Sequence, residues 1–165
     1  MPNKIKLLFV DDEERFLRTL TKRLNLRDFD VTATQNAEEA LSAMDVEKFD
    51  LAIVDLKMPG MNGQQLLSTM KKRQPDIEII ILTGHGSIES AQACTREGSF
   101  CYLQKPCETK ELLGVLKAAY MEAIRKKTEL NALEMAEILT AANEGSSLAI
   151  LRKLKALSDK MGKHS

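Results

Sequence analysis

Three aspartates stand directly after two apolar segments of this 165-residue chain. Asp11 and Asp12 follow the run at residues 4–10, and Asp55 follows the run at 50–54. In an open parallel sheet, side chains just beyond the carboxyl ends of neighbouring strands meet in one crevice. Two unit charges ~4 Å apart repel by ~4 kcal/mol at an effective dielectric constant near 20. Such a cluster persists only with a cation among its members or with raised pKa values, so the pattern predicts a cation site.

Two further side chains at strand ends extend this site. Thr83 closes the apolar run at 77–82 and offers a hydroxyl donor, and Lys105 follows the segment at 100–103. A lysine ammonium is a mobile point charge that suits an oxyanion or a phosphoryl group. Oxygen ligands without His or Cys favour Mg²⁺ or a similar hard ion. Together these groups predict in-line phosphoryl transfer with a carboxylate as the nucleophile.

The elements that must position these residues follow from the hydrophobic pattern. Short aliphatic runs alternate with amphipathic helical patterns, and nearly continuous apolar runs are typical of strands buried on both faces of a parallel sheet. The predicted strands are residues 4–10, 31–34, 50–54, 77–82 and 100–103. Asn36 with Glu39, and Asn62 with Gln65, mark helix starts, and Gly98 ends a helix over 87–97. We therefore predict an α/β fold with a five-stranded parallel sheet, order 2-1-3-4-5, and helices on both faces.

The pattern changes from about residue 122. Two short amphipathic helices are predicted, at 129–142 and 148–161, with a turn between them at 143–147. No heptad repeat is sustained there, which disfavours a long coiled coil. We expect one domain over residues 1–126 and a helical C-terminal extension over residues 127–165.

Composition excludes several other classes of protein. Lys and Arg together number 24, as do Asp and Glu, so no net charge attracts the chain to nucleic acid or anionic lipid. The apolar runs fall short of the ~20 residues of a membrane helix, and no signal peptide precedes them. Three cysteines without a CxxC motif are typical of reduced thiols, so we expect a cytoplasmic protein with no membrane contact.

Four motifs in combination closely resemble the receiver domain of bacterial two-component response regulators, the CheY-like domain. They are Phe9-Val-Asp-Asp-Glu-Glu, Val54-Asp-Leu-Lys-Met-Pro-Gly-Met-Asn-Gly63, Leu82-Thr-Gly and Tyr102-Leu-Gln-Lys-Pro106. The resemblance spans about residues 4–126. It implies that Asp55 accepts a phosphoryl group from a sensor histidine kinase or a phosphotransfer protein. The chain would then be a signalling switch and not an enzyme, assisting only its own phosphorylation and dephosphorylation.

The resemblance also implies roles for the neighbouring residues. Asp12, Asp55 and the backbone carbonyl of Lys57 would hold Mg²⁺, with Asp11 contributing through water. Lys105 would contact the phosphate, and its bond to Pro106 would be cis.

The same resemblance names a switch. Thr83 and Tyr102 would be the switch pair, and Lys57 and His85 stand at the positions that tune hydrolysis in the family. Output would pass to a second copy or to an effector protein, through the face of the fourth helix, fifth strand and fifth helix, or through the C-terminal helices.

Two alternatives remain open from the sequence. The extension could form a minimal helix-turn-helix with residues 148–161 as recognition helix and Arg152, Lys153 and Lys155 as contacts, although so few basic residues disfavour DNA binding. A metal-dependent phosphatase with Asp11 as nucleophile is weaker, because such enzymes need Asp-x-Asp after the first strand, where this chain has Asp11-Asp12-Glu13, and because an obvious cap domain is lacking.

Overall fold

Five parallel strands form one sheet in the computed structural model, which describes residues 3–161 apart from 59, 61, 85, 87, 128–139 and 141–146. The strands are β1 (Ile5–Val10), β2 (Phe29–Thr34), β3 (Leu51–Val54), β4 (Glu78–Thr83) and β5 (Cys101–Gln104). Their order is β2-β1-β3-β4-β5, which confirms the predicted sheet. The predicted bounds differ by one or two residues, most at β2, which begins at Phe29 and not at residue 31.

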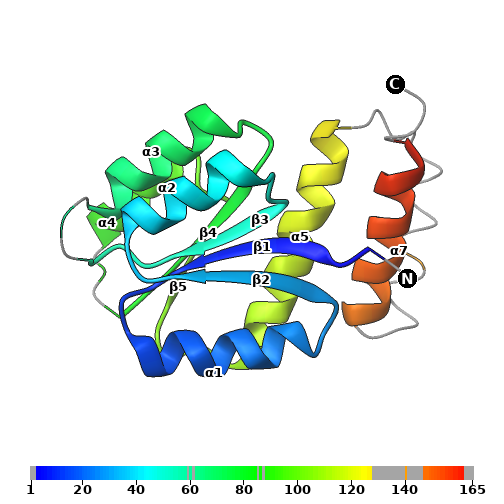
Figure 1. The fold of residues 1–165 in the computed structure, drawn as a ribbon, viewed down its shortest axis with the longest axis horizontal. Helices are drawn as coiled ribbons and strands as arrows, with labels where there is room; N and C mark the ends of the chain where they lie inside the picture. Colours follow the sequence, from blue (N-terminus) through cyan, green and yellow to red (C-terminus); the bar gives the residue numbers. More distant parts are fainter. Residues whose placement is uncertain are drawn as a thin grey trace.

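Helices cover both faces of this sheet (Figure 1). They are α1 (Glu14–Asn25), α2 (Ala37–Val46), α3 (Gly63–Arg73), α4 (Ile88–Arg96), α5 (Thr109–Lys127) and α7 (Ser147–Met161). The helices α1 and α5 lie on one face, and α2, α3 and α4 lie on the other. The predicted helix at 129–142 lies outside the described residues except for Thr140, whereas the one at 148–161 corresponds to α7.

Alternation along each strand divides the apolar side chains between two cores. Leu7 and Phe9 of β1 pack in the core under α1 and α5, while Leu8 and Val10 pack in the core under α2, α3 and α4. All six residues of β4 are buried, which is why the central strands appear in the sequence as continuous apolar runs.

The predicted helix caps are present at three ends. The side chain of Asn36 accepts a hydrogen bond from the amide of Glu39, and Asn62 accepts one from Gln65, each at 2.8 Å. Gly98 follows α4 with a φ of 103°, a left-handed conformation that glycine adopts without strain. These caps fix where α2 and α3 begin and where α4 ends.

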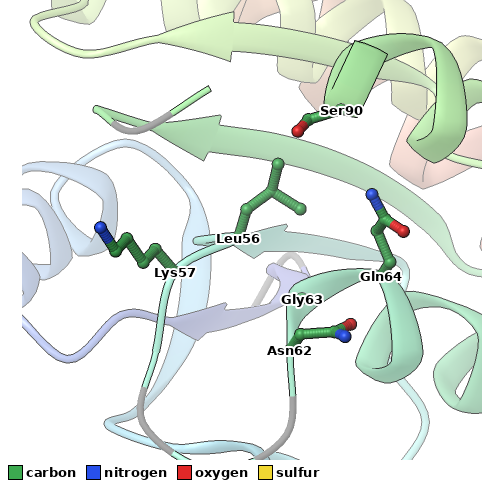
Figure 2. Close-up of a pocket in the computed structure, with 6 residues that line it drawn as sticks. All are labelled: Leu56, Lys57, Asn62, Gly63, Gln64 and Ser90. Atoms are coloured by element: carbon green, nitrogen blue, oxygen red, sulfur yellow. The ribbon is translucent and has the colours of Figure 1, made fainter. Parts of the chain in front are cut away.

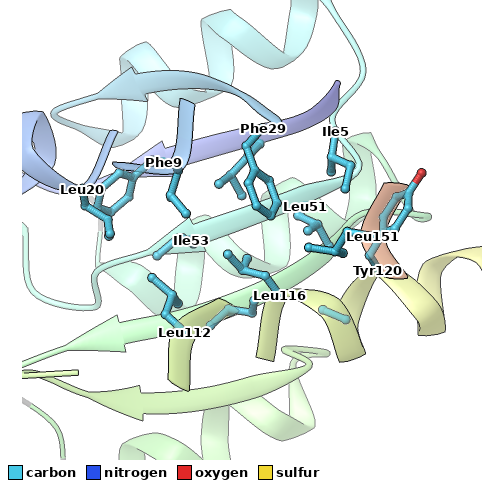
Figure 3. Close-up of a cluster of buried hydrophobic side chains, with 14 of the residues drawn as sticks. Ile5, Phe9, Leu20, Phe29, Leu51, Ile53, Leu112, Leu116, Tyr120 and Leu151 are labelled. Atoms are coloured by element: carbon cyan, nitrogen blue, oxygen red, sulfur yellow. The ribbon is translucent and has the colours of Figure 1, made fainter. Parts of the chain in front are cut away.

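The C-terminal extension docks on the parallel-sheet domain through α7. This helix lies beside α5, at the end of the sheet where the strands begin (Figure 1). Its side chains Ile150, Leu151 and Leu154 are fully buried and join the same core as β1 and α5. Figure 3 shows Leu151 beside Tyr120 of α5, at the edge of the cluster that also holds Leu51.

Ion pairs fix α7 to the same end of the sheet. Lys155 donates to the carboxylate of Asp50 at 3.0 Å, and Arg152 pairs with Asp28. Asp50 directly precedes β3 and is buried, so its charge requires such partners. Two of the three cations proposed as DNA contacts are thus engaged within the chain, which disfavours the recognition-helix hypothesis. None of the helices that the structure describes combines the length and apolar character needed to cross a bilayer.

Removing the central anchor of α7 should destabilise the whole domain. We expect Leu151→Ala to lower the free energy of unfolding by ~2–5 kcal/mol, because the lost methyl groups leave a cavity in the core. The exposed Ala156 on the same helix provides a control, and Ala156→Ser should change stability by no more than ~0.5 kcal/mol. Urea unfolding followed by circular dichroism measures both. Equal stability of the two variants would show that α7 does not pack on the domain.

Candidate functional site

Backbone pairing carries each functional residue just beyond its strand. The amide of Asp55 donates to the carbonyl of Val10 at 3.0 Å and so continues the pairing of β1 with β3. The amide of Lys105 donates to the carbonyl of Thr83 at 2.9 Å and continues the pairing of β4 with β5. The site is therefore held by the backbone hydrogen bonds of the sheet.

The sheet brings the three predicted aspartates together. One carboxylate oxygen from each of Asp11, Asp12 and Asp55 lies within 4.8 Å of the other two. Asp11 and Asp55 are buried, whereas Asp12 is exposed to solvent. Two buried anions at this distance require a cation close by.

Lys105 supplies one such charge from β5. Its ammonium nitrogen lies 2.7 Å from a carboxylate oxygen of Asp11, 3.2 Å from Glu13 and 3.7 Å from Asp55. The same nitrogen lies 4.2 Å from the ring centroid of Phe16, in cation–π geometry. The Lys105–Pro106 peptide bond is cis.

Burial and pairing shift the pKa of both members of the central ion pair. Burial raises the pKa of the Asp11 carboxyl above its ordinary value, although the hydrogen bonds from Lys105 and from the Glu13 amide oppose this. Burial alone would lower the pKa of Lys105, but its bond to Asp11 and the charges of Asp11 and Asp55 raise it overall. Lys105 is consequently charged at neutral pH.

The loop after β3 closes tightly on the start of α3. The amide of Gly63 donates to the carbonyl of Leu56 at 3.0 Å, and a Cβ at Gly63 would lie 2.5 Å from the Leu56 Cα. Leu56 and Lys57 extend to different sides of the loop, and a pocket between α3 and α4 is lined by Leu56, Gly63 and Ser90 (Figure 2). The amide of Lys57 donates to Asp55 at 3.3 Å, so the loop folds back over the aspartate.

The predicted switch pair lies on the two neighbouring strands. Thr83 is fully buried at the end of β4, and Tyr102 of β5 packs against the core under α2, α3 and α4. The hydroxyl of Tyr102 is buried as well. His85, the predicted neighbour of this pair, lies outside the described residues.

Two residues at the site were not predicted from the sequence. Glu13 pairs with Lys105, and Phe16 lies beneath its ammonium group. Glu13 directly follows the aspartate pair, and Phe16 comes three residues later, one helical turn into α1. This spacing was the available indication that both face the same crevice.

Comparison with known proteins identifies the same architecture. The family model for the response regulator receiver domain matches residues 7–117. The chain is 42% identical over 113 residues to the transcriptional regulatory protein GlrR of Escherichia coli, covering 68% of this chain and 26% of that protein. The chain thus spans about a quarter of the length of this curated relative.

Solved structures extend the likeness to the fold. A CheY-like receiver domain protein from Methanospirillum hungatei superposes with a TM-score of 0.72 at 29% identity, covering 74% of this chain and 98% of that one. A response regulator from Burkholderia pseudomallei, solved with a phosphorylated aspartic acid, a calcium ion and citrate, superposes with a TM-score of 0.67 at 29% identity. That similarity covers 93% of this chain and 96% of the other, and therefore includes part of the extension.

Substitution of Gly63 tests the closed loop beside Asp55. We expect Gly63→Ala to lower the free energy of unfolding by ~1–3 kcal/mol, because the new methyl group meets backbone atoms of Leu56. Gly114 in α5 is the matched control, since a Cβ there meets nothing within 4 Å. Gly114→Ala should raise stability by ~0.5–1 kcal/mol through its helix propensity. If thermal unfolding shows the same sign for both variants, the described loop geometry is wrong.

Proposed function

The chain belongs to the response regulator receiver domain family, and from this premise we propose that it is a phosphorylation switch with Asp55 as the phosphoacceptor. A sensor histidine kinase or a phosphotransfer protein is the proposed donor. The switch turns over no substrate of its own and assists only the gain and loss of its phosphoryl group.

The observation that carries this proposal is how differently the two buried aspartates are engaged. Asp11 accepts hydrogen bonds on both oxygens, from the amide of Glu13 at 2.9 Å and from Lys105 at 2.7 Å. Asp55 accepts one long hydrogen bond, from the Lys57 amide at 3.3 Å, among the residues that the structure describes. Its other oxygen lies 3.7 Å from Lys105, beyond hydrogen-bond range. Asp55 therefore keeps the more available nucleophilic oxygen, which also argues against a phosphatase that uses Asp11.

In the proposed step an oxygen of Asp55 attacks the phosphorus atom of the donor. A new oxygen–phosphorus bond forms while the bond from phosphorus to the donor breaks, and the donor keeps that electron pair. Lys105 is charged and placed beside both aspartates, so it can exchange its bond to Asp11 for one to a phosphoryl oxygen. Thr83, at the end of β4, offers a hydroxyl to another phosphoryl oxygen.

The donor set suits a hard divalent cation. Three carboxylate oxygens within 4.8 Å, with no nitrogen or sulfur ligand among them, fit Mg²⁺. Asp12, Asp55 and the carbonyl of Lys57 are the proposed ligands, with Asp11 acting through water. When bound, the ion supplies positive charge that neutralises the phosphoryl oxygens. The calcium ion in the Burkholderia pseudomallei response regulator is consistent with such a site here.

The switch follows from the charge that the phosphoryl group adds, roughly −1.5 to −2 at neutral pH. Thr83 and Lys105 gain new acceptors, and the loop after β4 moves with Thr83. Inverting a 1:99 equilibrium requires about 5.5 kcal/mol of differential binding, which two or three charge-assisted hydrogen bonds approach. We propose that Tyr102 follows this loop and changes the surface formed by α4, β5 and α5.

The proposed switch also implies a partner surface and a cytoplasmic location. The exposed surface of α4, β5 and α5 is the proposed contact with a second copy or an effector protein. The described residues include three free cysteines, Cys94, Cys101 and Cys107, as expected in the reducing cytoplasm.

Phosphoryl uptake provides the direct test. We expect Asp55→Asn to abolish labelling by acetyl phosphate in the presence of Mg²⁺, because the amide is not a nucleophile. Mass spectrometry of the intact protein measures the added phosphoryl group. The exposed Asp76 lies in a loop before β4, and Asp76→Asn serves as the control that should label as the wild type does. Persistent labelling of the Asp55 variant would place the nucleophile elsewhere.

Metal binding tests the carboxylate cluster separately. We expect Asp12→Asn to weaken Mg²⁺ binding on the order of 10- to 100-fold, because the site loses one anionic oxygen ligand. Isothermal titration calorimetry measures the affinity. Glu14→Gln is the control, since Glu14 is exposed and pairs with Arg18 on the outside of α1. An unchanged affinity in the Asp12 variant would exclude this aspartate from the metal site.

A further inference from the structure

Tyr102 occupies the space in which a side chain at position 86 would lie. A Cβ built on Gly86 would overlap the hydroxyl oxygen of Tyr102 and would lie 2.5 Å from its ring carbon Cζ. Cβ atoms in proteins do not approach other atoms so closely. The hydroxyl oxygen and the ring carbons Cζ and Cε1 of Tyr102 all lie within 3.2 Å of this position. The backbone of Gly86 lies outside the left-handed region, so the contact with Tyr102, and not backbone strain, opposes a larger residue.

Packing, and not hydrogen bonding, holds the tyrosine in this place. Its ring packs against the core under α2, α3 and α4, and among the described residues its buried hydroxyl has no hydrogen-bond partner. Burial raises the pKa of the Tyr102 hydroxyl, with smaller contributions from Cys94 and Asp55. A buried hydroxyl without a partner gains nothing from this position, so the space beside Gly86 decides whether the ring fits.

We propose that Gly86 is a positioning residue for Tyr102, because its missing side chain creates the slot that admits the ring to its inward position. This inference rests on the proposed function and deepens it. It names the residue that determines the relative populations of the inward and outward positions of the Tyr102 ring. Gly86 lies in the loop from Thr83 to α4 that the switch is proposed to move. A displacement of this loop would change the size of the slot beside Gly86. The contact between Gly86 and the Tyr102 ring therefore couples the loop to the tyrosine.

The same loop offers a matched control. Gly84 lies two residues earlier, and a Cβ there would meet its nearest neighbour, the Cβ of Lys105, at 3.8 Å. That is an ordinary van der Waals distance. Gly84→Ala and Gly86→Ala therefore make the same chemical change in one loop, but only the second fills the slot.

Fluorine NMR of protein labelled with 3-fluorotyrosine tests the proposal. The chain has two tyrosines, so the Tyr102 resonance is assigned by its loss in Tyr102→Phe. A soluble gadolinium chelate then reports its exposure. We expect Gly86→Ala to lower the inward-to-outward ratio of Tyr102 by about tenfold or more, because overpacking of this kind is strongly unfavourable. Gly84→Ala should leave the ratio unchanged. Equal exposure of Tyr102 in the two variants would overturn the proposal.

A double-mutant cycle keeps the proposal testable if Gly86→Ala is unstable. The loss of stability caused by Gly86→Ala should disappear in a Tyr102→Ala background, where the ring is absent. It should persist in a Tyr102→Phe background, because the ring carbon Cζ still meets the new methyl group. An equal loss in the Tyr102→Ala background would mean that Gly86 acts through another neighbour, and the proposal would fail.

One further measurement separates this inference from the phosphoacceptor role. Gly86→Ala should still be labelled at Asp55 by acetyl phosphate, while the change that beryllofluoride produces in the Tyr102 resonance should be lost. A normal response of Tyr102 in Gly86→Ala would overturn the positioning role. Absence of labelling in the wild type would overturn the phosphoacceptor proposal alone, since the exposure of Tyr102 is measured without phosphorylation.

Discussion

Lys105 holds one ammonium group among three carboxylates that the sheet forces together at its carboxyl end. The parallel pairing of β1 with β3 leaves Asp11 and Asp55 no freedom to separate, because the backbone of each continues the sheet. A single lysine cannot neutralise three anions, so the crevice has a deficit of positive charge. This deficit explains why the site favours a divalent cation. In the proposed phosphorylation step, Lys105 would also have to exchange one of its present bonds for a bond to the phosphoryl group.

At the opposite end of the sheet, lysines of the chain itself neutralise the buried carboxylates. Asp50 and Glu78 are buried where β3 and β4 begin. Lys126 pairs with Glu78 at 2.8 Å and Lys155 with Asp50 at 3.0 Å, from α5 and α7 respectively. These carboxylates are paired within the chain and need no added cation. The extension is therefore anchored at the end of the sheet opposite the aspartates, away from the loops that the proposed switch would move.

Sequence reasoning predicted the sheet and the three aspartates, because strands buried on both faces leave unbroken apolar runs and because strand ends of a parallel sheet converge. It missed the start of β2 at Phe29, since the exposed Asp30 interrupts the apolar pattern of this edge strand. The docking of α7 was not predictable, because an apolar stripe containing Leu151 is the same whether it packs on its own chain or on another. The pairing of Glu13 with Lys105 and the slot at Gly86 depend on distances that spacing along the chain does not encode.

The short distance between Gly86 and the Tyr102 ring bears on the proposed signalling role. In the proposed switch, a phosphoryl group on Asp55 acts on Thr83 and Lys105 directly, through charge-assisted hydrogen bonds. The electric field of the added charge is screened by solvent and has little effect at the outer surface of α4, β5 and α5. In the proposed switch, steric contact therefore carries the change from the loop to β5, because a packed interior yields little to compression and so transmits displacement. A glycine opposite a large ring makes that contact close enough for a small movement of the loop to decide where the ring lies.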